Sequence, residues 1–219
     1  MPETAQPGSI RNVTIAPVGL DGMLGLPPGA KGIVLFAHGS GSGRYSPRNN
    51  FVAEALRDSG LATLLFDLLT VEEERDRRNV FDIELLAQRL LTATAWVREN
   101  AATAGLAIGY FGASTGAAAA LVAAAARDNP VAAIVSRGGR PDLAGPALAA
   151  VAAPTLLIVG GDDTDVLALN RAAFAKLHCE KQLTVVPGAT HLFEEPGALE
   201  AVVDHARGWF LAHLRGPGV

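Results

Sequence analysis

The chain has 219 residues, 49% of them hydrophobic, and a formal net charge of -4. This length suits one large α/β domain with a covered core, so we expect a single domain over residues 1–219 with flexible tails at 1–9 and 215–219. The slightly acidic balance provides no basic surface, which excludes nucleic acid as an expected partner.

Short apolar runs alternate with helical patterns along the whole chain. The expected strands are 13–16, 22–26, 32–37, 62–66, 107–111, 132–135, 155–159 and 183–186. The expected helices are 50–59, 81–99, 115–127, 143–150, 166–177 and 196–214. This alternation predicts a mostly parallel eight-stranded sheet with helices on both faces. The short segment between 135 and 155 leaves no room for a cap, so we expect an open site.

A glycine-rich loop, residues 38–43 (HGSGSG), follows the third expected strand. A strand, a glycine loop and a helix also open dinucleotide-binding folds, in which G-x-G-x-x-G leads directly into the helix. Here the glycines run G-x-G-x-G and Pro47 delays the expected helix, which argues against a bound dinucleotide. Further on, the charged run 72–78 (EEERDRR) indicates solvated surface, and the edge of a mobile lid remains the alternative interpretation.

The stretch Gly112-Ala113-Ser114-Thr115-Gly116 lies between an apolar run and an alanine-rich helical run. A sharp strand-to-helix turn at this point would raise the Ser114 hydroxyl above the edge of the sheet. The glycines fit that turn because side chains at their positions would collide with the neighbouring strand and helix.

Two arginines, Arg137 and Arg140, follow the sixth expected strand. They lie at the carboxyl ends of the strands, where open α/β sheets bind their ligands, and arginine suits a substrate carboxylate. The alternative is that they form surface ion pairs with acidic residues such as Asp142.

An aspartate and a histidine follow the last two expected strands. We expect Asp163 to be the acid, with Asp162 as the second choice and Asp165 as the N-cap of the next helix. His191 is the expected base. A serine hydroxyl needs a base within hydrogen-bond reach, and the base needs an orienting carboxylate, so the order Ser114, Asp163, His191 has a chemical rationale.

These motifs resemble those of the α/β-hydrolase superfamily, and within it the small capless enzymes similar to dienelactone hydrolase. The resemblance extends from residues 38–49 (HGSGSGRYSPRN) through the turn at 112–116 to residues 188–191 (GATH). The chain also resembles the hydrolase domain found fused to phosphoribosyltransferases. One difference stands out: the namesake dienelactone hydrolases carry cysteine where this chain has Ser114, which argues against dienelactone as the substrate.

The resemblance implies a serine hydrolase that cleaves small carboxylic esters or lactones through an acyl-enzyme. It implies backbone N–H donors from Ser40 and Thr115 for the oxyanion, and His38 as an anchor of the first donor's loop. It implies no metal and no organic cofactor. A catalytically silent receptor or partner-binding protein, and an acyltransferase with the same triad, remain the alternatives.

The remaining expectations concern the cell. Cys179 is the single cysteine and has no partner for an internal disulfide, which favours a reducing compartment. The amino terminus lacks the pattern of a leader, and no long apolar run indicates a membrane partner, so we expect a cytoplasmic protein. The sequence does not exclude a homo-oligomer.

Overall fold

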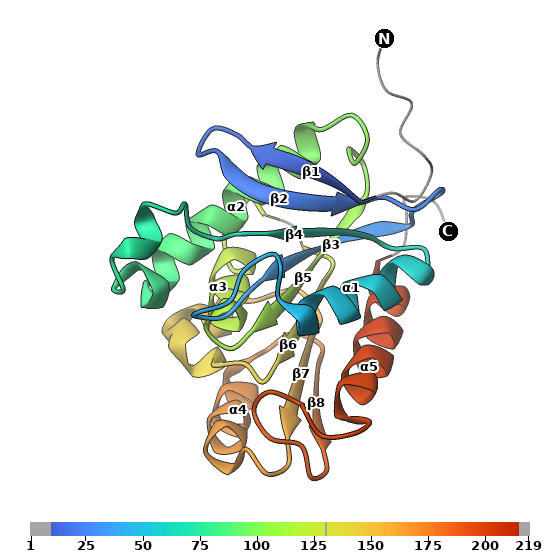
Figure 1. Cartoon of the computed structure of the whole chain (residues 1–219). Coiled ribbons are helices and arrows are strands. Elements are labelled where there is room, and N and C mark those ends of the chain that lie inside the picture. The colour runs from blue at the N-terminus through green and yellow to red at the C-terminus, as the bar shows by residue number, and fades with distance from the viewer. Residues whose placement is uncertain (1–9, 130, 215–219) are drawn as a thin grey trace.

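The computed structural model describes residues 10–129 and 131–214, so the tails for which flexibility was expected lie outside the described residues. Within that part of the chain, the strands form one eight-stranded sheet in the order β1-β2-β4-β3-β5-β6-β7-β8 (Figure 1). The strands are β1 (Ile10–Ile15), β2 (Leu20–Gly25), β3 (Gly32–Ala37), β4 (Ala62–Phe66), β5 (Ala107–Ala113), β6 (Ala133–Arg137), β7 (Thr155–Gly160) and β8 (Lys181–Val186). Strand β2 pairs antiparallel with both β1 and β4, and the pairs from β4 to β8 are parallel. The expected fold class, an α/β-hydrolase fold, is confirmed.

Two helices cover one face of the sheet and three cover the other (Figure 1). Helices α1 (Pro47–Asp58) and α5 (Ala198–His213) pack on the first face, and α2 (Ile83–Glu99), α3 (Thr115–Ala124) and α4 (Thr164–Lys176) pack on the second. The short 3-10 helices are η1 (Glu73–Arg75), η2 (Asn79–Phe81) and η3 (Pro141–Ala150). None of the helices in the described ranges is long and apolar enough to cross a membrane.

The central strands are buried, and most of their side chains are apolar. Every residue of β3, β4, β6 and β7 is buried, because helices cover both faces there, whereas the edge strands β1 and β8 are partly exposed. Helix α3 lies close against the sheet, and all of its residues but Val122 are buried. Its small alanine side chains permit that close approach.

Several boundaries differ from the sequence-based expectation, three of them at α1, η3 and α4. Helix α1 begins at Pro47, because Ser46 caps it and proline suits a first helical position, so Pro47 opens the helix instead of delaying it. Residues 141–150 form a 3-10 helix with a kink at Gly145, whose φ is 54°. Pro146 comes directly after this kink, inside the helix. Helix α4 begins at Thr164, which places Asp165 in its first turn, so the N-cap predicted at Asp165 is wrong.

Between β6 and β7 the chain contains only η3 and short connections, so no cap covers the carboxyl end of the sheet there. The loops after β3, β5, β6, β7 and β8 therefore meet at an open edge.

Candidate active site

The turn after β5 holds Ser114 in a backbone conformation that is rare for a residue with a side chain. Its φ is 51° and its ψ is -122°, and the next residue begins α3. A Cβ on Gly116 would lie 2.1 Å from the carbonyl oxygen of Ala37, so only glycine permits this approach of α3 to β3. The strained serine is maintained by the surrounding backbone, as the glycine spacing predicted.

His191 and Asp163 are in direct contact. Nδ1 of His191 lies 2.7 Å from Oδ2 of Asp163, and the Asp163 side chain is 14% exposed. Asp163 occupies the N-cap position of α4, but its carboxylate binds His191 instead of the helix. Asp162 and Asp165 are exposed. Of the three candidate carboxylates, the structure brings Asp163 to the histidine.

Ser114 and His191 both lie close to the end of β6. The N–H of Ser114 donates to the carbonyl of Arg137 at 3.4 Å, and a Cβ on Gly138 would lie 3.0 Å from the carbonyl oxygen of His191. Within the described ranges, no hydrogen bond joins Ser114 Oγ to His191 directly. Such contacts are often long in a site without substrate and shorten when substrate binds.

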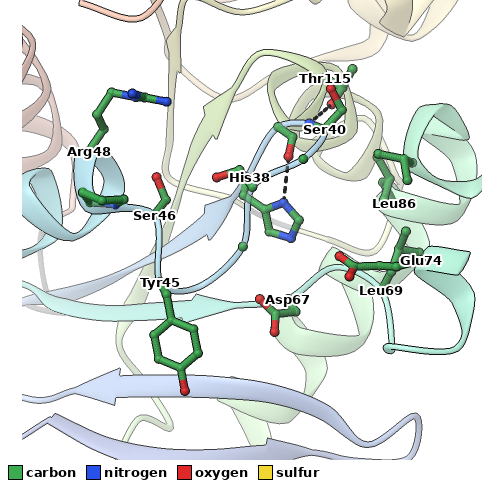
Figure 2. Close-up of a pocket in the computed structure, with 16 residues that line it drawn as sticks. His38, Ser40, Tyr45, Ser46, Arg48, Asp67, Leu69, Glu74, Leu86 and Thr115 are labelled. Atoms are coloured by element: carbon green, nitrogen blue, oxygen red, sulfur yellow. Dashed lines mark hydrogen bonds between the residues drawn. The ribbon is translucent and has the colours of Figure 1, made fainter. Parts of the chain in front are cut away.

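The two expected oxyanion donors come from adjoining segments. The N–H of Ser40 donates to Oγ1 of Thr115 at 3.2 Å, so the loop after β3 and the start of α3 are in contact (Figure 2). Thr115 follows Ser114 directly, which places its own N–H at the beginning of the helix. We refer to residues 38–46 as the oxyanion loop.

His38 fixes the start of the oxyanion loop. Its Nε2 accepts the N–H of Leu68 at 3.0 Å, and its Nδ1 lies 3.0 Å from the carbonyl oxygen of Gly39. The ring is therefore neutral with the proton on Nδ1, which donates to Gly39. Burial lowers the pKa of His38, and the carbonyl of Gly39 and the charge of Asp67 offset part of that effect.

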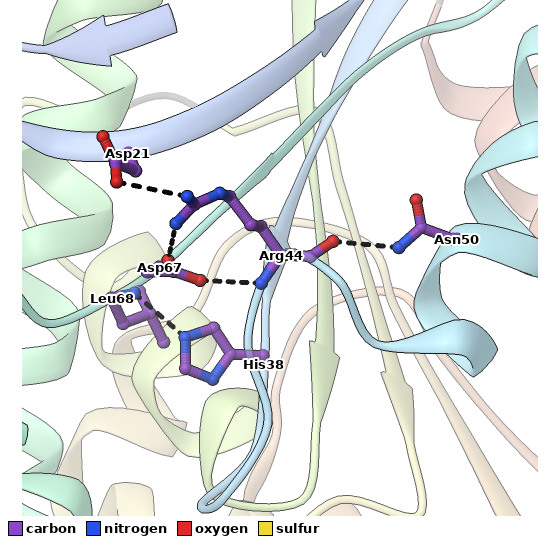
Figure 3. Close-up of polar contacts among 6 residues, drawn as sticks. All are labelled: Asp21, His38, Arg44, Asn50, Asp67 and Leu68. Carbon is purple, nitrogen blue, oxygen red and sulfur yellow. Dashed lines mark hydrogen bonds and ion pairs between the residues drawn. The ribbon is translucent and has the colours of Figure 1, made fainter. Parts of the chain in front are cut away.

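Arg44 fixes the far end of the same loop (Figure 3). Its N–H donates to Oδ1 of Asp67 at 2.7 Å, and its guanidinium pairs with Asp67 and with Asp21, the latter at 3.1 Å. Asn50 on α1 donates to its carbonyl oxygen at 2.9 Å. Sequence reasoning missed this cluster, because its members come from four separate segments and form no local motif.

A cavity of about 660 Å³ opens beside the oxyanion loop. Figure 2 shows Tyr45, Ser46 and Arg48 on one side of it and Leu69, Glu74 and Leu86 on the other. Most of the charged run at 72–78 is exposed, and Glu74 of this run also lines the cavity. Other residues of the charged run form ion pairs: Glu73 pairs with Arg89, and Asp76 pairs with Arg78.

The two arginines after β6 have different surroundings. Arg140 makes a two-pronged pair with Asp142, at 2.9 and 2.8 Å, and that hydrogen bond raises its pKa. This is the ion pair given as the alternative to substrate binding. Arg137 is only 8% exposed. Burial lowers its pKa to about 10, and the charge of Arg48 contributes to that decrease.

Comparison with known proteins places this geometry in context. A model of the dienelactone hydrolase family matches residues 20–209. The chain is similar to a dienelactone hydrolase of Anabaena variabilis, with 59% identity, a TM-score of 0.90, and coverage of 94% of this chain and 98% of that one. Est1E of Butyrivibrio proteoclasticus shares the fold at 15% identity, with a TM-score of 0.75 over 93% of this chain and 98% of its own.

Two curated relatives from Mycobacterium tuberculosis strains are described as putative phosphoribosyl transferases. Each is 63% identical over 206 residues, which cover 94% of this chain and 46% of the relative. The chain thus spans about half the length of these relatives. The sequence resemblance to a hydrolase domain fused to phosphoribosyltransferases agrees with this match.

Proposed function

The chain belongs to the dienelactone hydrolase family, and we propose that it is a serine hydrolase of small carboxylic esters or lactones. The observation that carries the proposal is the contact between His191 Nδ1 and Asp163 Oδ2 at 2.7 Å, beside a serine held at a φ of 51°. An oriented histidine and a strained serine at the head of a helix are the parts that acyl transfer requires.

In the proposed reaction, Ser114 Oγ attacks the substrate carbonyl while Nε2 of His191 takes its proton. Asp163 holds the proton on Nδ1 and stabilises the imidazolium. The N–H groups of Ser40 and Thr115 donate to the developing oxyanion. His191 then protonates the leaving alcohol, and water, activated by the same histidine, releases the acid from Ser114.

The dimensions of the site support small substrates. A cavity of about 660 Å³ lies in the size range of small-molecule sites, and the edge of the sheet between β6 and β7 has no cap. We propose hydrolysis and not phosphoribosyl transfer for this chain, since the matched half of the curated relatives corresponds to the segment with the turn, the acid and the histidine. The same residues would also serve acyl transfer to an acceptor other than water.

The test combines labelling with kinetics. The wild-type protein should react with a fluorophosphonate at Ser114 and hydrolyse a p-nitrophenyl ester. Ser114→Ala should abolish labelling and lower kcat by about 10⁴ to 10⁶, because the covalent route is lost. His191→Ala should cost nearly as much, and the double variant little more. Additive losses would exclude the triad, and an unlabelled wild type would favour a silent receptor.

A matched set of aspartate variants tests the acid. Asp163→Asn should lower kcat by about 10⁴, since the amide would stabilise the wrong tautomer of His191. Asp162→Asn and Asp165→Asn are the controls, because both side chains are exposed. A comparable loss in either control would mean that the acid has been assigned to the wrong residue.

A further inference from the structure

Asn170 is a fully buried polar residue of α4. Its Nδ2 donates to the carbonyl oxygen of Gly139 at 2.9 Å and to that of Val166, one turn earlier in the helix, at 2.8 Å. Both N–H bonds of the amide are thus used, and one of them leaves the helix to reach the segment after β6. A buried side chain that donates to a loop carbonyl fixes that loop, because the carbonyl would otherwise be left without a partner away from water.

The peptide group between Gly139 and Arg140 is held at both of its ends. Its carbonyl accepts the bond from Asn170, and its N–H, which belongs to Arg140, donates to the carbonyl oxygen of Ser114 at 3.0 Å. That oxygen also accepts the N–H of Ala117 in α3 at 3.1 Å. A peptide group is rigid and planar, so a bond at one end fixes the direction of the other. Asn170 is therefore joined to the backbone of Ser114 through a single peptide group.

The packing around Gly139 fixes its position but not the direction of its carbonyl. A Cβ on Gly139 would collide with Oγ of Ser136, which is fully buried on β6, and would lie 2.6 Å from Cβ of Ala117. These contacts leave no space for the chain to shift toward β6 or α3. The bond from Asn170 then determines which way the Gly139 carbonyl points.

The same segment, residues 137–140, also borders the expected base. A Cβ on Gly138 would lie 3.6 Å from Nδ1 of His191. The helix that holds Asn170 begins directly after Asp163, and these two residues are seven positions apart, which places them on the same side of α4. Asn170 and the segment thus contact or belong to the elements that carry all three residues of the proposed triad.

We propose that Asn170 is a positioning residue of the proposed hydrolase, because it fixes the peptide that holds Ser114 next to His191. The inference rests on the proposed function, in which Oγ of Ser114 passes its proton to His191. A misplacement of about 1 Å at such a site can cost about 10²-fold in rate. Every residue that lines the cavity belongs to 38–86 or is Thr115, so substrate binding should change little when Asn170 is lost.

The kinetic test compares two buried asparagines. Asn170→Ala should lower kcat for a p-nitrophenyl ester by about tenfold to a hundredfold and keep KM within about twofold. Asn129→Ala is the matched control, since the buried Asn129 also donates two bonds, to the Tyr110 hydroxyl at 3.0 Å and to the Ala123 carbonyl at 2.9 Å. It follows α3, at the opposite end of that helix from Ser114.

Both variants should lower the Tm by about 5 °C, because each leaves buried acceptors unpaired. Only Asn170→Ala should lower kcat. Equal kcat values in the two variants, or a loss that appears in KM instead of kcat, would overturn the proposal.

A second variant covers the case in which Asn170→Ala does not fold. In Asn170→Ser the hydroxyl can still donate to the Val166 carbonyl, four residues earlier, but is too short to reach Gly139. Its kcat should fall as in Asn170→Ala, with a smaller change in Tm. A kcat at the wild-type value would show that the bond to Gly139 has no role in positioning.

Hydrogen exchange followed by NMR separates this inference from the proposed function. The Arg140 N–H should exchange about tenfold faster in Asn170→Ser than in the wild type, measured against the amides of β3, whether or not the protein hydrolyses esters. The exchange should stay unchanged in Asn129→Ala. Unchanged exchange in Asn170→Ser would overturn the proposal, whereas faster exchange in a protein that cleaves no ester would mean that the hydrolase function, and not the contact, is wrong.

Discussion

The turn around Ser114 and the oxyanion loop meet at the same site but are held in different ways. Backbone contacts fix the turn: Gly116 lies where a Cβ would be 2.1 Å from the carbonyl oxygen of Ala37. Side chains fix the loop, through His38 at one end and Arg44 with Asp67 at the other. The first arrangement tolerates no added atom, whereas the second can lose one contact and keep its fold. We expect mutations in the turn to affect stability first, and mutations around the loop to affect catalysis first.

The largest expected effect tests the backbone contacts of the turn. Gly116→Ala should destabilise the protein by about 3 kcal/mol, because the new methyl group collides with main-chain atoms that cannot rotate away. Gly208→Ala in α5 is the control: a Cβ at that position would meet nothing within 4 Å, and alanine there should stabilise the protein by about 0.5–1 kcal/mol. Urea unfolding measures both. An unchanged free energy of unfolding in Gly116→Ala would show that the turn can move.

The second prediction tests the side-chain contacts of the loop. Asp67→Asn removes the ion pair with Arg44 and should lower kcat by about tenfold to a hundredfold with little change in KM, because the Ser40 donor moves. Asp21→Asn is matched to it, since Asp21 binds the same arginine but its side chain is 58% exposed. That change should leave kcat near the wild-type value, as exposed ion pairs contribute about 0–1 kcal/mol. Equal losses of kcat in Asp67→Asn and Asp21→Asn would mean that Arg44 itself, and not the position of the loop, limits activity.

The smallest expected effect concerns pH and His38. Burial holds the pKa of His38 below the usual value of about 6.5, so the unfolded chain takes up the proton first as the pH falls. The free energy of unfolding should therefore fall below about pH 6.5, by at most about 1.4 kcal/mol per pH unit for this group. His38→Gln should reduce that slope, while the exposed His205→Gln should retain it. An unchanged slope in His38→Gln would assign the effect to other residues.

The contrast between backbone contacts in the turn and side-chain contacts around the loop also explains which features the sequence could predict. The strands, the turn at Ser114 and the position of His191 all follow from local patterns, because glycine spacing and apolar runs report backbone geometry directly. The choice of Asp163 among three neighbouring carboxylates rested on loop spacing, and the structure shows a contact between its carboxylate and His191. Helix ends were less predictable: capping by Ser46 and the kink at Gly145 moved two boundaries.

Contacts between distant segments were not predictable. Arg44 and Asp67 are 23 residues apart, and nothing in either segment indicates the other. Arg48 lies on α1 and Arg137 lies on β6. Arg48 contacts Glu194, and Arg137 contacts the neighbouring Phe193. Arg137 and Arg140 were equivalent in sequence, three residues apart, yet only Arg140 has an acidic partner in the described part of the chain. Their difference depends on tertiary packing.

The hydrogen bond from Ser40 N–H to the Thr115 hydroxyl has a consequence for the proposed hydrolase. An incoming carbonyl oxygen competes with this hydroxyl for the same donor, and exchanging one neutral acceptor for another gains little. A negatively charged oxygen forms a bond about twice as strong and wins the competition. If Ser40 is an oxyanion donor as proposed, the Thr115 hydroxyl would weaken binding of the resting ester more than binding of the transition state, which would favour turnover over tight substrate binding.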